Sequence, residues 1–369
     1  MSSSWQHTGY AQRVHFGAGA LDLLPAILRD LGARRVLVIS TTGRLASPDG
    51  ERLVARLDRV VSSTFGGVRS HVPASAVQAA VLQARRDGVD VIVSFGGGSC
   101  MDMGKAVSYF VEQEAGTPGA SYTDRPALMH VAVPTTYSGA EVTPFFGVTD
   151  ERTRAKSGGG GPTTAPVAAV YDPLVTLSTP PRVSAETAMN ALAHCVEVTY
   201  ATRRSPEAEA IALAGADRIV RWLPAVVDEP DDVEARAGLL EGSSLAGRAL
   251  ENASMGVHHG LAQLLGARAD IPHGLANALI LAPAIRFNTE VVPAELARIG
   301  AVLGDPADPG AAVTRLVARV GLPSTLSEVG VTEADLDAVA RLSQASVAVR
   351  ANPRPVSEED ARAILAAAF

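Results

Sequence analysis

The stretch VDVIVSFGGGSCMDMGKAVSYF, residues 89–110, joins an apolar run to three glycines and then to a helical pattern. Its apolar part, VDVIVS, is rich in β-branched residues, which is typical of a buried strand. The glycines at 96–98 allow the backbone to approach a ligand closely. The first amides of the following helix lie unpaired at the positive end of its dipole, so they favour an anion such as a pyrophosphate. The stretch predicts a strand, a phosphate-binding loop and a helix; a glycine-rich turn that binds no ligand is the alternative.

The same alternation of strands and helices surrounds this stretch. Helical patterns occupy 21–32 and 76–88, and buried-strand patterns occupy 35–40, 89–99, 129–139 and 165–173. Such alternation predicts a parallel, doubly wound sheet. Beyond residue 173 helical periodicity dominates, in 184–201, 205–227, 233–253, 310–321 and 333–347. We therefore predict a Rossmann-like, doubly wound α/β domain over residues 1–175 and an all-α domain over residues 176–369.

Composition limits the classes of protein to which the chain can belong. Its 369 residues suffice for two hydrophobic cores, and 47% hydrophobic against 19% charged residues argues against a disordered chain. A net charge of -7 provides no basic surface for nucleic acid or an anionic membrane. Two isolated cysteines, Cys100 and Cys195, make neither a disulfide framework nor a zinc site. The opening MSSSWQHTGY lacks the pattern of a signal peptide, and no apolar run approaches about 18 residues, so we expect a cytoplasmic protein with no membrane partner.

Hydroxyl side chains follow two of the predicted strands. The loop that begins at Pro134 carries Thr135, Thr136 and Ser138, whose hydroxyls can bond phosphate, ribose or a nicotinamide amide. As turn residues they can equally bond their own backbone. Because open α/β sheets bind ligands outside the carboxyl ends of their strands, we expect this loop and the glycine loop to face one crevice.

The strand pattern at 35–40 ends in Ser40, Thr41 and Thr42, which we include among the predicted cofactor-binding residues. An acidic residue at this point would bind the ribose hydroxyls and repel a 2′-phosphate. None is present, so NADH and NADPH are both permitted.

Histidines gather in the helical half of the chain. Asn190 and His194 are four residues apart in a helical pattern, so they share one face. His258, His259 and His273 follow, the last in the turn DIPHG (270–274). We interpret His194, His259 and His273 as one pocket, although each taken alone is more often a structural histidine.

Four groups of residues occur in an order and spacing that resemble the iron-containing alcohol dehydrogenases. They are Gly97-Gly98-Ser99 with Asp102 and Lys105, Pro134-Thr135-Thr136 with Gly139 and Glu141, Asn190 with His194, and His259 with Pro272-His273-Gly274. Within this family, the chain most resembles the maleylacetate reductase branch. The segments that carry this resemblance are PTTYSGAEVTPFFGVTD (134–150), MNALAHCVE (189–197), the doubled His258-His259 and ANPRPV (351–356). This resemblance spans nearly the whole chain and implies the dehydroquinate synthase-like two-domain fold, an active site in the cleft between the domains, and a homodimer. By position it assigns cofactor binding to Gly97, Gly98, Ser99, Asp102, Thr135, Thr136 and Ser138.

The resemblance also implies where a metal would bind. Metal-using relatives hold Fe or Zn with an aspartate and three histidines, and the matching positions here are Asn190, His194, His259 and His273. Asparagine offers only a neutral carbonyl oxygen, so a divalent ion would lie among neutral ligands with no anion to offset its charge. We therefore expect no metal, or a weakly held one.

Without a metal, three imidazoles can bind a substrate carboxylate and deliver a proton. Such a site suits the reduction of an activated carbon–carbon double bond in a small acid by NADH or NADPH. For maleylacetate, the substrate that the resemblance implies, the product would be 3-oxoadipate. The predicted catalytic residues are His194, His259, His273, Asn190, Tyr137 and Lys156, and the predicted substrate contacts are His258, Gln263 and Phe146.

Two departures from the branch lie where substrate should bind. Gln263 stands four residues after His259, where many relatives carry a second histidine, and glutamine cannot titrate. Lys156 is followed by SGGGG (157–161), which we expect to form a mobile loop without side chains that could grip a carboxylate. Three alternatives stay open. One is a metal-dependent alcohol dehydrogenase or carbonyl reductase on the same scaffold. The others are a biosynthetic homologue repurposed for another small oxo or enoyl acid, and a non-redox descendant such as a lyase or a binding protein.

Overall fold

The computed structural model describes residues 5–57, 59–116, 126–153 and 156–369, which form two compact units. The strand unit comprises residues 9–136 and 140–179, and the helical unit comprises residues 5–8, 137–139 and 180–369. The predicted boundary between residues 175 and 176 falls within the short 3-10 helix η3 (Pro173–Thr176). The roles predicted for the two domains stay predictions.

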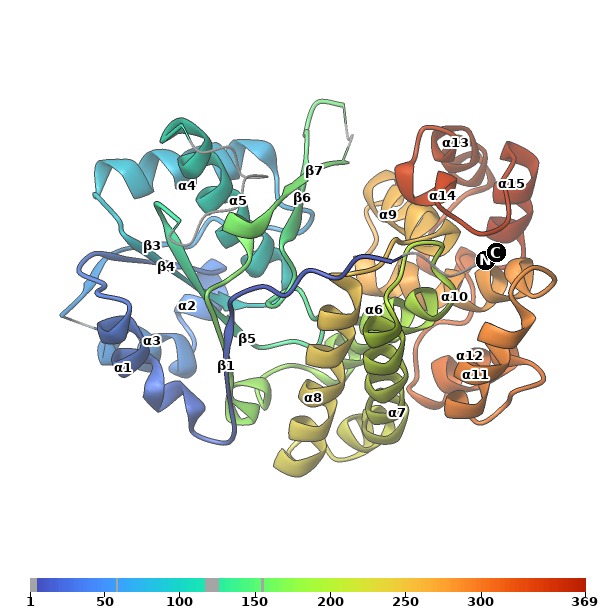
Figure 1. The fold of residues 1–369 in the computed structure, drawn as a ribbon, viewed down its shortest axis with the longest axis horizontal. Coiled ribbons are helices and arrows are strands. Elements are labelled where there is room, and N and C mark those ends of the chain that lie inside the picture. Colours follow the sequence, from blue (N-terminus) through green and yellow to red (C-terminus); the bar gives the residue numbers. More distant parts are fainter. Residues whose placement is uncertain (1–4, 58, 117–125, 154–155) are drawn as a thin grey trace. The chain divides into compact units, whose positions relative to one another are not determined.

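Within the described residues, a six-stranded parallel sheet forms the centre of the strand unit, in the order β1-β8-β5-β4-β2-β3. Figure 1 labels β1, β3, β4 and β5 of this sheet. Its strands are β1 (Arg13–Phe16), β2 (Val36–Ile39), β3 (Val61–Phe65), β4 (Val91–Gly96), β5 (Met129–Pro134) and β8 (Ala168–Tyr171).

Both faces of this sheet are covered by helices. Val36 and Val38 of β2 belong to the core cluster that contains α1 (Leu24–Asp30) and α3 (Pro48–Arg56). Leu37 and Ile39 belong to the cluster that contains α4 (Ala74–Arg86) and α5 (Gly98–Glu114). Successive side chains of a strand point to opposite faces, so an unbroken apolar strand serves both clusters. The predicted doubly wound α/β architecture is confirmed.

A hairpin of two antiparallel strands, β6 (Phe145–Thr149) and β7 (Lys156–Gly160), also belongs to the strand unit. The prediction of a mobile loop over residues 157–161 was therefore wrong, because most of it is strand β7. The glycines have a packing reason: a Cβ on Gly159 would lie 2.8 Å from the ring of Phe146, and one on Gly160 would lie 2.7 Å from the carbonyl oxygen of Pro144. Glycine lets β7 approach β6 where a side chain would not fit.

The helical unit is built around α6 (Pro181–Tyr200), which is buried along most of its length. It packs against α7 (Pro206–Asp228) and α8 (Val233–Leu250), and all three are seen together in Figure 1. The other helices are α9 (Val257–Ala269), α10 (His273–Asn288), α11 (Pro293–Leu303), α12 (Pro309–Arg319), α13 (Glu333–Ser343), α14 (Val347–Arg350) and α15 (Glu358–Ala366). The predicted helical character of this part is confirmed. Among the residues described, no helix combines the length and apolar character needed to span a membrane.

Candidate active site

Two loops predicted to bind a dinucleotide lie side by side in the strand unit. β4 and β5 are neighbours with Gly96 opposite Pro134, and the amide of Thr135 donates to the carbonyl of Gly96 at 2.8 Å. A Cβ built on Gly97 would lie 3.2 Å from Oγ1 and Cγ2 of Thr136. Since Gly97 directly precedes α5, the glycine loop, the threonine loop and the N-terminus of that helix meet at one place. We call the segments 96–98 and 134–136 the strand-end loops.

The hydroxyls near the strand-end loops differ in what they already bind. Ser40 donates to a backbone carbonyl of β4 at 2.5 Å, Thr41 accepts from an amide three residues later at 3.1 Å, and Thr42 donates to a carbonyl after β3 at 3.0 Å. Thr135 and Thr136 are buried, and their Oγ1 atoms have no hydrogen-bond partner among the residues that the structure describes. Because a buried hydroxyl without a partner is unfavourable, Thr135 and Thr136 fit a bound ligand better than the three hydroxyls at 40–42 do.

Asp102 and Lys156 meet at the hairpin. Asp102 accepts the amide of Gly147 at 3.2 Å and pairs with the buried amine of Lys105 at 2.9 Å. Burial lowers the pKa of Lys156, and the charge of Asp102 opposes this shift. Phe146, a predicted substrate contact, is buried in the same region against two aromatic rings of α5. Asp102 therefore attaches the hairpin to α5, a role that the sequence did not indicate.

The segment Tyr137–Gly139 packs within the helical unit. Arg236 donates to the hydroxyl of Tyr137 at 3.1 Å, and Nδ2 of Asn190 donates to the carbonyl of Ser138 at 3.5 Å. A Cβ on Gly139 would lie 2.7 Å from a carbonyl oxygen of α8. Arg236 is fully buried. Nothing in its ordinary helical sequence context indicated this role.

The predicted histidines come together in the helical unit. Asn190, His194 and Glu197 lie on one buried face of α6. The ring of His194 stacks on that of His259 from α9, with centroids 4.6 Å apart and an interplanar angle of 15°. The ring of His273, the first residue of α10, lies 6.4 Å from that of His259. We call these three rings the imidazole cluster.

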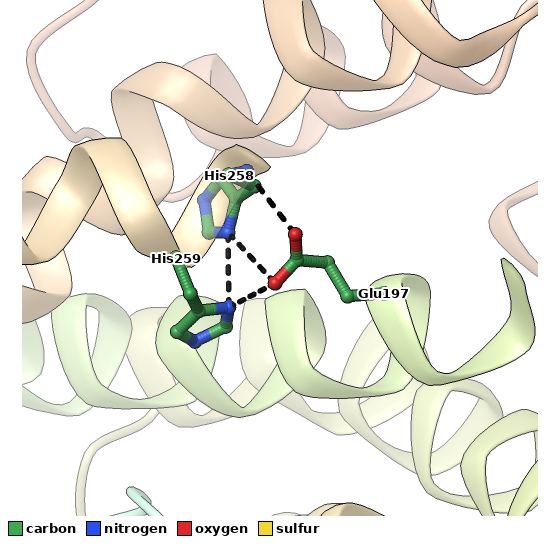
Figure 2. A group of neighbouring side chains, drawn as sticks. All are labelled: Glu197, His258 and His259. Carbon is green, nitrogen blue, oxygen red and sulfur yellow. Dashed lines mark hydrogen bonds and ion pairs between the residues drawn. The ribbon is translucent and has the colours of Figure 1, made fainter. Parts of the chain in front are cut away.

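Glu197 places a carboxylate against this cluster, as Figure 2 shows. Its Oε2 lies 2.5 Å from Nδ1 of His259, and its Oε1 accepts the amides of Gly256 and His258 at 3.0 and 3.1 Å. Burial alone would raise the pKa of Glu197, but the charges and hydrogen bonds of His259 and His258 lower it, so the carboxyl is ionised. Burial, followed by the charge of His259, holds the pKa of His194 well below its usual value. Glu197 was not predicted, although its place three residues after His194 on one helical face could have indicated it.

Comparison with known proteins decides the family. One family model, described as iron-containing alcohol dehydrogenase, matches residues 11–173, and another, described as the C-terminal part of the Fe-containing alcohol dehydrogenase family, matches residues 184–369. The chain belongs to the iron-containing alcohol dehydrogenase family. Maleylacetate reductase from Rhizobium sp. (strain MTP-10005) is 36% identical over 98% of this chain and 97% of its own length. Maleylacetate reductase 2 from Cupriavidus pinatubonensis is 35% identical over 97% and 94%.

Solved structures agree with this membership. Maleylacetate reductase from Agrobacterium tumefaciens superposes with a TM-score of 0.87 at 33% identity, covering 100% of this chain and 98% of its own. A 1,3-propanediol oxidoreductase superposes with a TM-score of 0.92 at 28% identity, covering 99% and 100%. The predicted family, its maleylacetate reductase branch and the fold are confirmed, and the chain is an oxidoreductase.

Iron-containing alcohol dehydrogenases owe their name to a metal, but the donors at the predicted positions here do not fit one as they are arranged. A metal binds an imidazole nitrogen along its lone pair, in the ring plane, at about 2.0–2.1 Å. The planes of His194 and His259 are nearly parallel, so their lone pairs do not converge on one point. Asn190, with a buried Oδ1 that has no partner among the described residues, contributes no charge.

Two further residues predicted to contact substrate, His258 and Gln263, lie on α9 together with His259. His258 is fully buried, with Nε2 at 2.9 Å from the carbonyl of Asn277 and Nδ1 at 3.2 Å from Nδ1 of His259. Both of its ring nitrogens face protein atoms, which does not favour direct contact with substrate. Glu197, His258 and His259 place donor atoms within 4.8 Å of one another, but they are already hydrogen-bonded to each other. Gln263 is half-buried on α9, one helical turn after His259.

Proposed function

We propose that this enzyme reduces maleylacetate to 3-oxoadipate with NADH or NADPH and without a bound metal ion. Relatives named maleylacetate reductase support the substrate class. The observation that carries the proposal is the arrangement of the imidazole cluster and Asn190. A metal would require ligands that converge on one point and include an anion, but here two rings are stacked and the amide of Asn190 is neutral. The same rings suit a carboxylate substrate.

The strand-end loops are the proposed cofactor site. The hydroxyls of Thr135 and Thr136 have no hydrogen-bond partner among the described residues, and they lie beside Gly97 at the N-terminus of α5, so they favour phosphate oxygens. When bound, the dihydronicotinamide supplies a hydride. Since Ser40, Thr41 and Thr42 include no carboxylate, this site accommodates NADPH as well as NADH.

His194, His259 and His273 are the proposed substrate site. Because its pKa is held well below the usual value, His194 contacts the substrate as a neutral ring. A protonated imidazole of His259 or His273 binds a substrate carboxylate, and a ring N–H delivers a proton to the carbon of the enolate that remains after hydride addition. One hydride and one proton together saturate the double bond and leave the keto and carboxylate groups unchanged. This chemistry requires no Lewis acid.

Oxidation of NADH and of NADPH with maleylacetate, followed at 340 nm, tests the proposal. We expect stoichiometric oxidation and 3-oxoadipate as the product. A panel of small oxo acids, enoyl acids and aldehydes serves as the comparison. Activity with aldehydes alone would favour a carbonyl reductase, and failure to bind either nucleotide would favour the non-redox alternative.

His194→Ala and His259→Ala should separate catalysis from cofactor binding. Loss of a general acid or a carboxylate contact lowers kcat/KM by about 10²–10⁴-fold. The dissociation constant of the nucleotide, measured by fluorescence titration, should change by no more than about twofold. His15→Gln, in β1 of the strand unit, is the control and should leave both quantities unchanged. Equal losses of nucleotide binding in the two cluster variants would contradict the assigned roles.

A further inference from the structure

Glu197 is buried between two histidines, and its contacts determine where their hydrogens lie. We propose that Glu197 is a positioning residue that keeps the hydrogen of neutral His259 on Nδ1, so that Nε2 is the nitrogen that carries the lone pair. The carboxylate Oε2 lies 2.5 Å from Nδ1 of His259. An ionised carboxylate only accepts hydrogen bonds, so the nitrogen that faces it must be the donor. Figure 2 shows the other ring nitrogen of His259 pointing away from Glu197.

The hydrogen bonds of His258 independently require a hydrogen on Nδ1 of His259. Its Nε2 lies 2.9 Å from the carbonyl oxygen of Asn277, so Nε2 carries a hydrogen. Nδ1 of neutral His258 is then an acceptor, and it lies 3.2 Å from Nδ1 of His259. Two acceptors, one from Glu197 and one from His258, therefore face the same nitrogen of His259. The alternative tautomer of His259 would leave three acceptors together with no hydrogen between them.

The carboxylate cannot turn away to relieve this constraint. Its Oε1 accepts the amides of Gly256 and His258 at the N-terminus of α9, where the helix dipole favours an anion. Asn352 accepts the amide between them, that of Val257, at 3.1 Å. Glu197 and Asn352 together therefore fix the turn that carries both histidines.

Asn352 belongs to the motif ANPRPV, and this network gives the motif a role. Its Nδ2 donates to Oδ1 of Asn288 at 2.8 Å, and Nδ2 of Asn288 donates back at 3.1 Å. Arg354 of the same motif stacks on Phe287, 4.3 Å from the ring centroid. The chain after α14 thus holds the end of α10 and the start of α9 together, which keeps His259 in place relative to Glu197.

The consequence for the reaction rests on the proposed function. In that reaction protonated His259 releases the hydrogen of Nε2 to the substrate carbon, its N–H bond breaks as the C–H bond forms, and a proton from water later replaces it. The neutral ring left behind is the Nδ1–H tautomer that Glu197 stabilises. No rearrangement of the ring is then needed between turnovers.

Glu197→Gln tests the assignment with almost no change of shape. The carbonyl of glutamine can still accept the α9 amides, but its NH₂ group then faces His259 and requires an acceptor there. Two-bond ¹H–¹⁵N spectra of histidine-labelled protein distinguish Nδ1–H from Nε2–H, and the His259→Gln variant identifies the signal. We expect Nδ1–H in the wild-type enzyme and Nε2–H in the variant. With maleylacetate, kcat should fall by about 10²-fold or more, because the variant stabilises the Nε2–H tautomer of His259 and not the Nδ1–H tautomer that the reaction leaves behind. Nucleotide affinity should be unchanged.

Glu112→Gln is the matched control, because Glu112 is also buried and accepts a backbone amide, but it lies in the strand unit and has no histidine partner among the residues that the structure describes. It should leave the His259 signal unchanged. Nε2–H in the wild-type enzyme, or an unchanged tautomer in Glu197→Gln, would overturn the inference, and the wild-type spectrum alone decides if that variant does not fold. If the spectra show the expected tautomers but the wild-type protein does not reduce maleylacetate, only the proposed function is refuted.

Discussion

Gly98 is the first residue of α5, two residues after the end of β4, and we expect a side chain there to cover the first amides of the helix. Gly98→Val should therefore weaken the binding of NADH and NADPH by about tenfold or more, because phosphate oxygens lose hydrogen bonds of the charge-assisted kind. Fluorescence titration measures this effect directly. Gly9→Val is the control, since a Cβ on Gly9 meets nothing within 4 Å. Equal affinity in both variants would remove the glycine loop from the cofactor site.

Glu141, two residues after Gly139, is buried in the strand unit and makes stability depend on pH. Burial raises its pKa from 4.5 to about 7, against the lowering effects of Tyr171 and Lys105. Between these values the folded state binds a proton that the unfolded state has lost, so stability falls as pH rises. The loss amounts to about 3 kcal/mol from pH 4.5 to pH 7.

The Glu141→Gln variant cannot ionise at this position, so its unfolding free energy should lack this dependence on pH. Urea unfolding of both proteins at pH 5, 6, 7 and 8 gives the difference in unfolding free energy at each pH. We expect the wild-type protein to lose about 3 kcal/mol relative to the variant across this range. A constant difference would mean that Glu141 titrates near its ordinary pKa.

At the scale of elements, the hairpin of β6 and β7 depends on glycine for its close packing. Gly159→Val places a Cβ 2.8 Å from the ring of Phe146, so the ring must shift within an apolar core. Overpacking of this kind costs about 1–3 kcal/mol in unfolding free energy, measured by urea titration. Ser157→Val is the control on the same strand, because Ser157 is exposed and should change stability by no more than about 0.5 kcal/mol. Equal stability of the two variants would show that β7 does not pack as described.

The elements that the sequence predicted are those with a strong local signal. The mostly apolar runs of β2, β4, β5 and β8 are buried on both faces, with Ser94 and His130 as polar exceptions, and such runs are recognisable without knowledge of the fold. β1 and β3 lie at the edges of the sheet and are mostly exposed or half-buried, so their short patterns did not stand out. β7 was missed because glycine normally weakens a strand, and only the ring of Phe146 explains why glycine is needed there.

The residues of the candidate site likewise divide into those that the sequence could indicate and those that it could not. Motif residues such as Gly97, Thr135, His194 and His259 could be selected from sequence because their chemistry is distinctive. The structural roles of Arg236 and Asn352 could not be predicted, because these residues act through contacts with Tyr137 and Val257, which are distant from them in the chain. Pairing over long sequence separations depends on how the helices pack, which local patterns do not encode.

Metal content is a property of the whole molecule, because the four candidate ligands come from three helices, α6, α9 and α10. An ion there would have to turn one of the two stacked rings, and it would meet no carboxylate within the set formed by Asn190, His194, His259 and His273. We expect protein purified without chelators to carry less than about 0.1 equivalent of Fe or Zn per chain after dialysis, measured by mass spectrometry of the elements. Treatment with EDTA should leave maleylacetate reduction unchanged.

Asn190→Asp makes this expectation sharper, because it supplies the missing anion without changing the size of the side chain. The new carboxylate no longer donates to the carbonyl of Ser138, and it adds a negative charge beside His194. Both changes favour a cation, so the variant should retain more Zn than the wild-type protein after the same dialysis and should lose activity as the ion displaces substrate from the imidazoles. One firmly held metal per wild-type chain, with activity lost on chelation and restored by that metal, would instead make this enzyme a metal-dependent dehydrogenase and assign the imidazoles to the ion.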